Sequence, residues 1–440
     1  MGNSNNSDKG AITRRKFLAG TGLLGTAVSL PSFAAEGFPA LTLPTGSPES
    51  VAADEDHWRR ISAYYPFKKD ITNLENGYFG MMPTPIENTY QDFIASVNSQ
   101  NSYYGRAQFY SDYRNYRKRT ADQLGANTSE VTFTRGATEA LQNLIANYNL
   151  LKPGDSVMYG DLDYGGMQEM FDWLADRRGV DVVRFNFPEP ASKQSILSMY
   201  ERLFAENPKL RLLILTHINN RTGLIIPVAE IAAMARASNI DVVLDAAHSF
   251  GHIDFKAADL GVDFIGLNFH KWMGGPLGVG AMYIKENRLK DIDPCFDNRM
   301  FPGNNIMTRV SSGTSNFAGF NMIPPVLDFH NALGPQHKQA RLRYLRDRWV
   351  NSVKDLKNLE ILTPDDPEMY CGITSFRIKG RGSAEENKAI EQELLDRYRI
   401  VVVHRDGVAK GDCVRVTPGM YTLAKDMDRL AAALREIVPA

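Results

Sequence analysis

The chain has 440 residues, of which 43% are hydrophobic and 23% are charged, so it is long enough for one large core or two globular domains. Its formal net charge of −1 excludes a general electrostatic attraction to nucleic acid or to an acidic membrane. The three cysteines, Cys295, Cys371 and Cys413, have neither metal-ligand spacing nor the pattern of a disulfide framework. We therefore expect neither a metal site nor binding of nucleic acid.

Residues 1–35 have the pattern of an export signal. A basic segment, ITRRKFLA, precedes the short apolar run GTGLLGTAVSL and the small-residue end PSFAA, a run too short to span a membrane. Arg14 and Arg15, with Phe17 and Leu18 behind them, resemble a twin-arginine signal specifically. We expect recognition by the twin-arginine export machinery, a periplasmic mature protein and no stable membrane anchoring after cleavage. A Sec signal or a disordered basic tail is the alternative.

Residues 36–75 are predicted to form an irregular N-terminal arm that ends in a helix, because the segment is rich in proline, serine and threonine before it gains aromatic residues. The segment ITNLENGYFG then indicates a strand and a tight turn at Asn76 and Gly77. Residues 84–124 have apolar positions at helical spacing. Their many tyrosines are more typical of packing or of dimer contacts than of a binding site.

A first strand-turn-helix unit follows in EVTFTRGATEALQNLIANY, with a helix expected to begin near Ala137. The free N–H groups of its first turn, the helix dipole and the Thr138 hydroxyl would together bind a phosphate. The same order recurs in SVMYGDLDYGG, which contains Tyr164, and in LLILTHINNRTG, which contains Asn220. Repeated strand-helix units of this kind predict a mostly parallel sheet flanked by helices.

The segment DAAHSFGHIDFKAADLGVDFIGLNFHKWMGG carries the clearest chemical signal. One buried strand ends at Asp245 and the next ends just before His270 and Lys271, so both would reach the same edge of a parallel sheet. A lysine and an aspartate in this arrangement suit pyridoxal phosphate (PLP). The amine holds the aldehyde as a Schiff base, and the carboxylate keeps the pyridine nitrogen protonated.

Beyond about residue 316 the chain is predicted to form a smaller α+β domain. A long helix is expected over residues 327–356, strands in GITSFRIKG, RIVVVHRD and CVRVTP, and helices in EENKAIEQELLDRY and at the C-terminus. The expected organisation is a signal peptide at 1–35, an arm at 36–75, a large PLP-binding domain at 76–315 and a small domain at 316–440.

The pattern DxxH, a strand, NFHK and GGPLGVGAMYI resembles the class V aminotransferase superfamily, whose members have PLP fold type I. The resemblance implies PLP as the cofactor, with Lys271 as its Schiff-base lysine and Asp245 at the ring nitrogen. It also implies that Tyr164 stacks on the ring and that Asn220 and His248 reach the ring oxygen. The residues that it places near the phosphate are Ala137, Thr138, Asn268, His270 and, from a second subunit, Gly313 and Thr314.

The same resemblance implies a homodimer with shared sites and a carboxylate-binding role for Arg415, with Asn76 close to the substrate. A planar guanidinium suits a bidentate contact with a carboxylate, although an ion pair within the chain is the alternative. A desulfurase would need a nucleophilic cysteine in the loop before Arg415, and that loop has none.

We therefore expect chemistry at the amino-bearing carbon of an amino acid or peptide, with Lys271 as the base. Export combined with this fold resembles the periplasmic PLP enzymes of pyoverdine maturation, which implies a glutamate of a siderophore precursor as substrate. An epimerase similar to isopenicillin N epimerase is the first alternative. A binder of PLP or peptide without catalysis is the second.

Overall fold

The structure, a computed structural model, describes residues 41, 43–68 and 70–439. The predicted signal peptide at 1–35 and the first residues of the predicted arm lie outside this part. Within the described residues, no helix is both long and apolar enough to cross a membrane.

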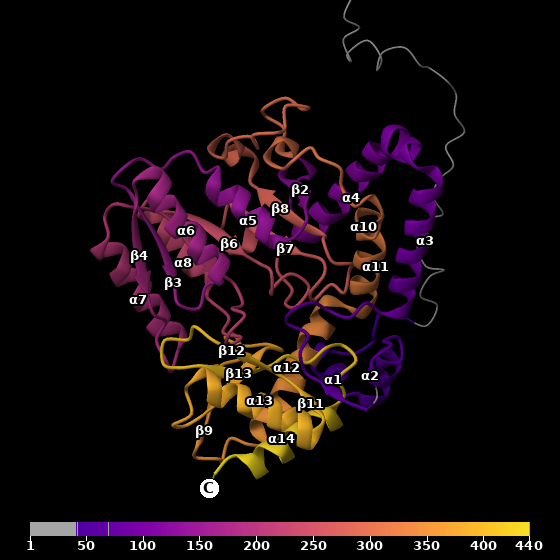
Figure 1. Ribbon diagram of the computed structural model, residues 1–440, viewed down its shortest axis with the longest axis vertical. Coiled ribbons are helices and arrows are strands. Elements are labelled where there is room, and N and C mark those ends of the chain that lie inside the picture. Colours follow the sequence, from indigo (N-terminus) through magenta and orange to yellow (C-terminus); the bar gives the residue numbers. More distant parts are fainter. Residues whose placement is uncertain (1–40, 42, 69, 440) are drawn as a thin grey trace, which may run out of the picture. The chain divides into compact units, whose positions relative to one another are not determined.

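The largest sheet among the described residues has seven strands in the order β2-β8-β7-β6-β5-β3-β4, and helices lie around it (Figure 1). All pairs from β7 to β4 are parallel, whereas β8 runs antiparallel to both β7 and β2. The strands are β2 (Val131–Thr134), β3 (Ser156–Gly160), β4 (Asp181–Phe185), β5 (Leu210–Thr216), β6 (Asp241–Asp245), β7 (Phe264–Asn268) and β8 (Gly280–Ile284). The predicted α/β fold with a mostly parallel sheet is therefore confirmed.

Helices cover both faces of this sheet because the inner positions of its central strands are apolar on both faces. Along β5, Leu212 and Ile214 pack into one hydrophobic cluster, while Leu213 and Leu215 pack into another. This alternation follows from the two-residue period of a strand. The first cluster is covered by α5 (Ala137–Ala146) and α6 (Gly165–Arg178), and the second by α7 (Lys193–Glu206) and α8 (Val228–Ala237). The short α9 (Ala257–Leu260) lies beside α8.

A smaller antiparallel sheet has the order β12-β13-β10-β9 and confirms the expected α+β region. Its strands are β9 (Leu359–Ile361), β10 (Thr374–Ile378), β12 (Val403–Arg405) and β13 (Cys413–Val416). It packs against α12 (Pro335–Asn351), α13 (Ala384–Tyr398) and α14 (Ala424–Ile437) through a third hydrophobic cluster. A parallel pair of two-residue strands, β1 (Thr72–Asn73) and β11 (Ile400–Val401), joins the arm to this region.

Two helical segments are divided where the sequence was read as continuous. Residues 84–124 form α3 (Thr84–Gln100), a π-helical turn (Tyr104–Gln108) and α4 (Phe109–Leu124), because Asn101 adopts a positive φ of 51°. The expected helix over 327–356 is wrong as one element. Gly334, at φ 78°, and the following Pro335 end α11 (Ile323–Leu333) and begin α12. The short α10 (Phe317–Asn321) precedes α11.

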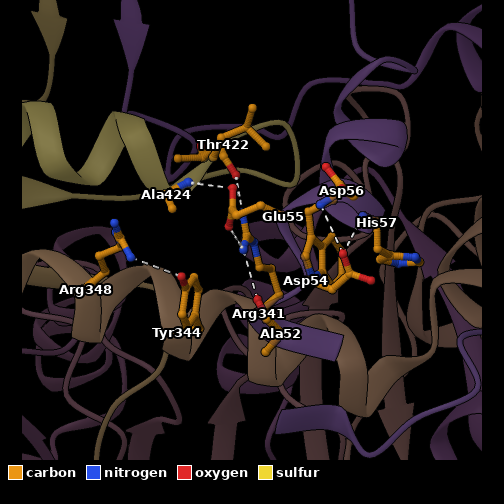
Figure 2. A network of polar contacts seen from close by, with 12 residues as sticks. Ala52, Asp54, Glu55, Asp56, His57, Arg341, Tyr344, Arg348, Thr422 and Ala424 are labelled. Atoms are coloured by element: carbon orange, nitrogen blue, oxygen red, sulfur yellow. Dashed lines mark hydrogen bonds and ion pairs between the residues drawn. The ribbon is translucent and has the colours of Figure 1, made fainter. Parts of the chain in front are cut away.

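The N-terminal arm is attached to α12 and to the start of α14 through one buried arginine (Figure 2). Arg341 is 1% exposed and pairs with Glu55, which begins α2 (Glu55–Ser62) after the short α1 (Pro48–Ala52). The guanidinium also donates to the carbonyls of Ala52 (2.9 Å) and Thr422 (3.3 Å). Glu55 in turn accepts the N–H of Ala424 at 3.1 Å. Segments from both ends of the described chain thus share one polar network.

Candidate active site

One cavity of about 700 Å³ lies at the carboxyl ends of the central parallel strands, where open α/β sheets bind their ligands. The register places Thr216 beside Asp245 and Asp245 beside Gly266, so β5, β6 and β7 end together. The first turn of α5, the turn at residues 75–78 and strands β12 and β13 complete the wall. A second cavity of about 730 Å³ is lined by residues 41–64 of the arm and contains neither a lysine nor a strand end.

Asp245 and Lys271 both line the first cavity, as expected from their positions at the ends of consecutive strands. Asp245 is 4% exposed, and burial raises the pKa of its carboxyl group, although the Ala247 N–H donates to it at 2.8 Å. Burial lowers the pKa of Lys271 to about 8, and the charge of Asp245 partly opposes that shift. The neutral, nucleophilic fraction of the Lys271 amine near neutral pH is therefore larger than that of an unshifted lysine.

His248 connects Lys271 to Trp272. The Nε2 atom of His248 lies 3.0 Å from the Lys271 amine, and its Nδ1 accepts the indole N–H of Trp272 at 3.3 Å. Burial and the nearby Lys271 charge hold the pKa of His248 well below its usual range, so the ring is neutral. Because Nδ1 accepts, the proton of the neutral ring lies on Nε2 and is donated to Lys271. This hydrogen bond forms with the neutral fraction of Lys271, which increases as the pH approaches about 8.

The other end of the cavity is built around the first turn of α5. The side chain of Asn268 accepts the Ala137 N–H at 2.6 Å, which fixes the end of β7 to the start of the helix. The N–H groups of Thr138 and Glu139 have no partner within the helix, because they belong to its first turn. His270 lines the same end, and burial lowers its pKa to about 4. This end thus offers backbone N–H groups, a hydroxyl and a neutral imidazole to a phosphate.

The residues present fit PLP, because four buried side-chain polar atoms of the cavity-lining residues have no protein partner among the described residues, and two of them lie where a cofactor role was predicted. The side-chain amide oxygen Oδ1 of Asn220 and the Nδ1 of His270 are buried and form no hydrogen bond there. An unpaired buried polar atom costs about 1–3 kcal/mol, so such atoms indicate a missing partner. The ring of Tyr164, which precedes α6 and is 41% exposed, also lines the cavity. Asn220, His270 and Tyr164 are all residues for which a cofactor role was predicted.

Arg415 lies on β13 at the side of the cavity formed by the small sheet and is 3% exposed. Its Nη2 pairs with Glu75 at 2.6 Å and its Nη1 donates to the Asn220 carbonyl at 2.7 Å. Gly77 lies so close that a methyl group at its Cα would overlap the guanidinium. The arginine is therefore held rigidly at the cavity wall.

Three of the predicted site residues do not line this cavity. Asn76 is buried between the Thr417 carbonyl (3.0 Å) and the Tyr421 hydroxyl (3.0 Å). It lines only a small neighbouring space of about 30 Å³ that also contacts Lys271. Gly313 and Thr314 are exposed and lie outside the cavity lining of their own chain.

Sequence reasoning overlooked several residues of the cavity wall. Thr216 ends β5 and donates its hydroxyl proton to buried Asp163 at 2.7 Å; its position at a strand end is the signal that identified Asp245. Arg405, on β12, and Glu75 also line the cavity. Glu75 stands immediately before the predicted turn, but no local pattern reveals its partner, which is 340 residues away.

The cysteines do not offer a nucleophile. Burial raises the pKa of the Cys371 thiol to about 12 and that of Cys413 to about 11, and both are fully buried outside the cavity lining. A reactive cysteine requires a lowered thiol pKa and access. In the described part of the chain, no cluster of three or more His, Cys, Asp or Glu side chains is placed to bind a metal ion.

Comparison with known proteins identifies the family. Residues 84–430 match the family model described as aminotransferase class-V. An isopenicillin N epimerase of Streptomyces clavuligerus is 26% identical, over 86% of this chain and 97% of the relative. A probable cysteine desulfurase of Vibrio cholerae is 25% identical, over 80% and 89% of the respective chains.

Solved structures agree in fold. The cysteine desulfurase of Thermococcus onnurineus matches with a TM-score of 0.74 at 19% identity, over 90% of this chain and 99% of that one. A C-DES variant with glycine covalently linked to its PLP cofactor matches with a TM-score of 0.73 at 21% identity, over 84% and 98%. The chain belongs to the class V aminotransferase family of fold type I and is a PLP-dependent enzyme.

Proposed function

We propose that the protein acts at the amino-bearing carbon of an amino acid or peptide, with Lys271 as both the covalent anchor of the cofactor and the base. One observation carries the proposal. A lysine amine with a lowered pKa, a buried carboxylate and a rigid arginine line a single cavity of about 700 Å³. PLP supplies an electron sink when it is bound.

The side chains have separate roles in this proposal. Lys271 removes and returns the proton at the substrate carbon, and the Nε2–H of His248 orients its amine. Asp245 holds a proton on the pyridine nitrogen, and the first turn of α5 with His270 binds the phosphate. Tyr164 covers the ring, Asn220 binds the ring oxygen, and Arg415 binds a carboxylate. Gly313 and Thr314 serve the phosphate of a partner subunit in a homodimer.

The substrate we propose is a glutamate of a pyoverdine-type siderophore precursor, modified in the periplasm. The twin-arginine pattern at residues 14–18 supports export, since this route transports folded proteins that already carry a cofactor. The rigid Arg415 supports a substrate that carries a carboxylate. Cysteine desulfuration is disfavoured because Cys371 and Cys413 are buried and have raised thiol pKa values.

Epimerisation of an amino acid or peptide is the second candidate. It is supported by the match to two isopenicillin N epimerases, each over 86% of this chain. Removal of the proton at the substrate carbon and return of a proton to the opposite face would suffice for this reaction, whereas amino-group chemistry would replace the amino group of the substrate by an oxo group.

The first experiment is an absorbance spectrum of the purified protein with PLP. The wild type should develop the band of lysine-bound PLP, and Lys271→Ala should lack it. Lys118→Ala is the matched control, since the Lys118 side chain is 63% exposed on α4 and far from the cavity lining. A protein that forms no such band would overturn the assignment of Lys271.

The second experiment separates the reaction types. L-glutamate and a glutamyl peptide would be incubated with the enzyme in D₂O and followed by NMR. Deuterium at the α-carbon with mixed stereochemistry would indicate epimerisation, and an oxo or decarboxylated product would indicate amino-group or carboxyl chemistry. A protein that binds PLP but changes neither the spectrum nor the substrate would be a binder without catalysis.

A further inference from the structure

Arg405 is a charged residue of the cavity wall that has neither an ion-pair partner nor a task in the proposed function. It lies on β12, which pairs antiparallel with β13, so that Val403 is opposite Arg415 and Arg405 is opposite Cys413. Residues directly opposite each other, and those two apart on one strand, share a face of the sheet. Arg405 and Arg415 therefore lie on one face of the sheet as diagonal neighbours, with Cα atoms about 7–8 Å apart. Both residues line the cavity.

The two arginines differ in their partners. Arg415 is matched by Glu75 at 2.6 Å. Arg405 forms none of the ion pairs found among the described residues. Asp412, just before β13, pairs with His404 at 2.7 Å, whereas the charges of Asp406 and Glu75 act on Arg405 without an ion pair. The Nε atoms of both arginines are buried and have no hydrogen-bond partner among the described residues, so the two differ in the ion pair that only Arg415 forms. A half-buried guanidinium at a cavity wall is thus left without an anion, which is costly unless a ligand supplies one.

The charges of the lining agree with this view. Four of the lining residues are cationic, namely Arg135, Lys271, Arg405 and Arg415, and three are acidic, namely Glu75, Glu139 and Asp245. Arg135 pairs with Glu139 at 3.0 Å, Glu75 pairs with Arg415, and Asp245 is the buried carboxylate near Lys271. Arg405 is the unmatched charge among these described residues.

We infer that Arg405 is a specificity-determining residue that binds a second carboxylate, and that the substrate is an amino acid unit with an acidic side chain. The inference rests on the proposed function, in which Arg415 binds the first carboxylate. Two guanidinium groups on one face of the sheet suit a dicarboxylate whose acidic groups are a few bonds apart. A monocarboxylic amino acid would leave Arg405 unmatched.

The test is calorimetric binding of two small acids to the PLP-loaded protein. Glutarate carries two carboxylates, and pentanoate has the same chain length with one. Wild-type protein should bind glutarate at least about tenfold more tightly, because each charge-assisted bidentate contact adds affinity. Arg405→Gln should remove this preference while its affinity for pentanoate changes little. Arg202→Gln is the matched control, since the Arg202 side chain on α7 is 66% exposed and outside the cavity lining.

Equal affinities of the wild type for the two acids, binding of neither acid, or a glutarate preference that persists in Arg405→Gln would each overturn the inference. The spectrum of lysine-bound PLP distinguishes this result from a failure of the proposed function. A protein that forms the Lys271-dependent band and shows no glutarate preference retains the proposed cofactor chemistry and loses only the role of Arg405.

Discussion

At the scale of single residues, the neutral amine of Lys271 has a measurable consequence. Burial lowers its pKa to about 8, opposed in part by Asp245, and the neutral amine is the nucleophile that joins PLP. The rate at which apoprotein takes up PLP should therefore rise with pH up to about 8 and then level off. The rate at which a free lysine derivative reacts with PLP should continue to rise towards pH 10, because the pKa of its amine is not lowered. A rate for the protein that follows the free amine would contradict the shift.

Gly77 is the second residue with a specific prediction. A methyl group at this position would overlap the Arg415 guanidinium, so Gly77→Ala should displace the arginine from Glu75 and Asn220. Carboxylate binding should weaken by about tenfold or more, equivalent to at least about 1.4 kcal/mol, while PLP uptake stays near the wild-type rate.

Calorimetric titration with glutarate and the absorbance of bound PLP measure these two effects separately. Gly303→Ala is the control, because a Cβ there has no neighbour within 4 Å among the described residues. If Gly77→Ala bound carboxylates like the wild type, Arg415 would not be the first carboxylate site.

Some of the site could be predicted from sequence because its residues stand where a local pattern changes. Asp245 and Lys271 follow apolar strands, and Ala137 begins an amphipathic helix after a glycine. Arg405 could not be found in this way. Its inferred role depends on the register between β12 and β13 and on the pairing of Asp412 with His404. Neither can be predicted from the hydrophobic pattern of the sequence.

At the scale of elements, α12 carries a buried lysine beneath the loop that holds Lys271. Lys338 is 2% exposed, donates to the Trp272 carbonyl, and has its pKa lowered by burial to about 7. The unfolded chain keeps that proton up to about pH 10.5. Between pH 7 and 10 the unfolded state therefore binds one proton more than the folded state, and folding stability rises with pH.

Lys338→Met should remove this contribution. The free energy of unfolding of the wild type relative to Lys338→Met should rise by about 1.4 kcal/mol per pH unit from pH 7.5 to 9. Urea denaturation at several pH values measures this difference. Lys118→Met, at an exposed position, should parallel the wild type. Parallel curves for Lys338→Met would mean that Lys338 is protonated in the folded protein.

The helices and strands were largely predictable, because strands with apolar inner positions and helices with one apolar face produce clear hydrophobic patterns in the sequence. The positions at which helices end were harder to predict. α11 ends before Gly334 and Pro335, two residues that commonly interrupt helices. The helix-forming residues on either side of them favoured one continuous helix. The positive φ of Asn101 between α3 and the π-helical turn depends on tertiary packing and not on a local signal.

At the scale of the whole molecule, stability depends on the network around Arg341 in Figure 2. Arg341→Met would leave Glu55, whose side chain is 30% exposed, without its cation and would release the Ala52 and Thr422 carbonyls. Breaking a buried pair costs about 3–5 kcal/mol, and the exposure of Glu55 reduces this to about 2–3 kcal/mol.

Urea denaturation should show that loss for Arg341→Met. Arg348→Met is the matched control. Arg348 also belongs to α12, but it pairs with Asp428 of α14 at the surface, where the two side chains are 40% and 49% exposed. Its loss should stay below about 1 kcal/mol. Similar losses for both variants would mean that the arm is not fixed by Arg341.

The contact between Glu75 and Arg415 spans 340 positions of the chain. A ribosome that synthesises the protein from its N-terminus delivers the strands and helix turns that carry Ala137, Asn220, Asp245 and Lys271 long before it delivers Arg405 and Arg415. The residues that one chain contributes to the PLP half of the cavity are thus synthesised before the two arginines of the carboxylate-binding half. A chain that ended before Arg405 would contain its own PLP-binding residues but neither of the arginines that we assign to carboxylates.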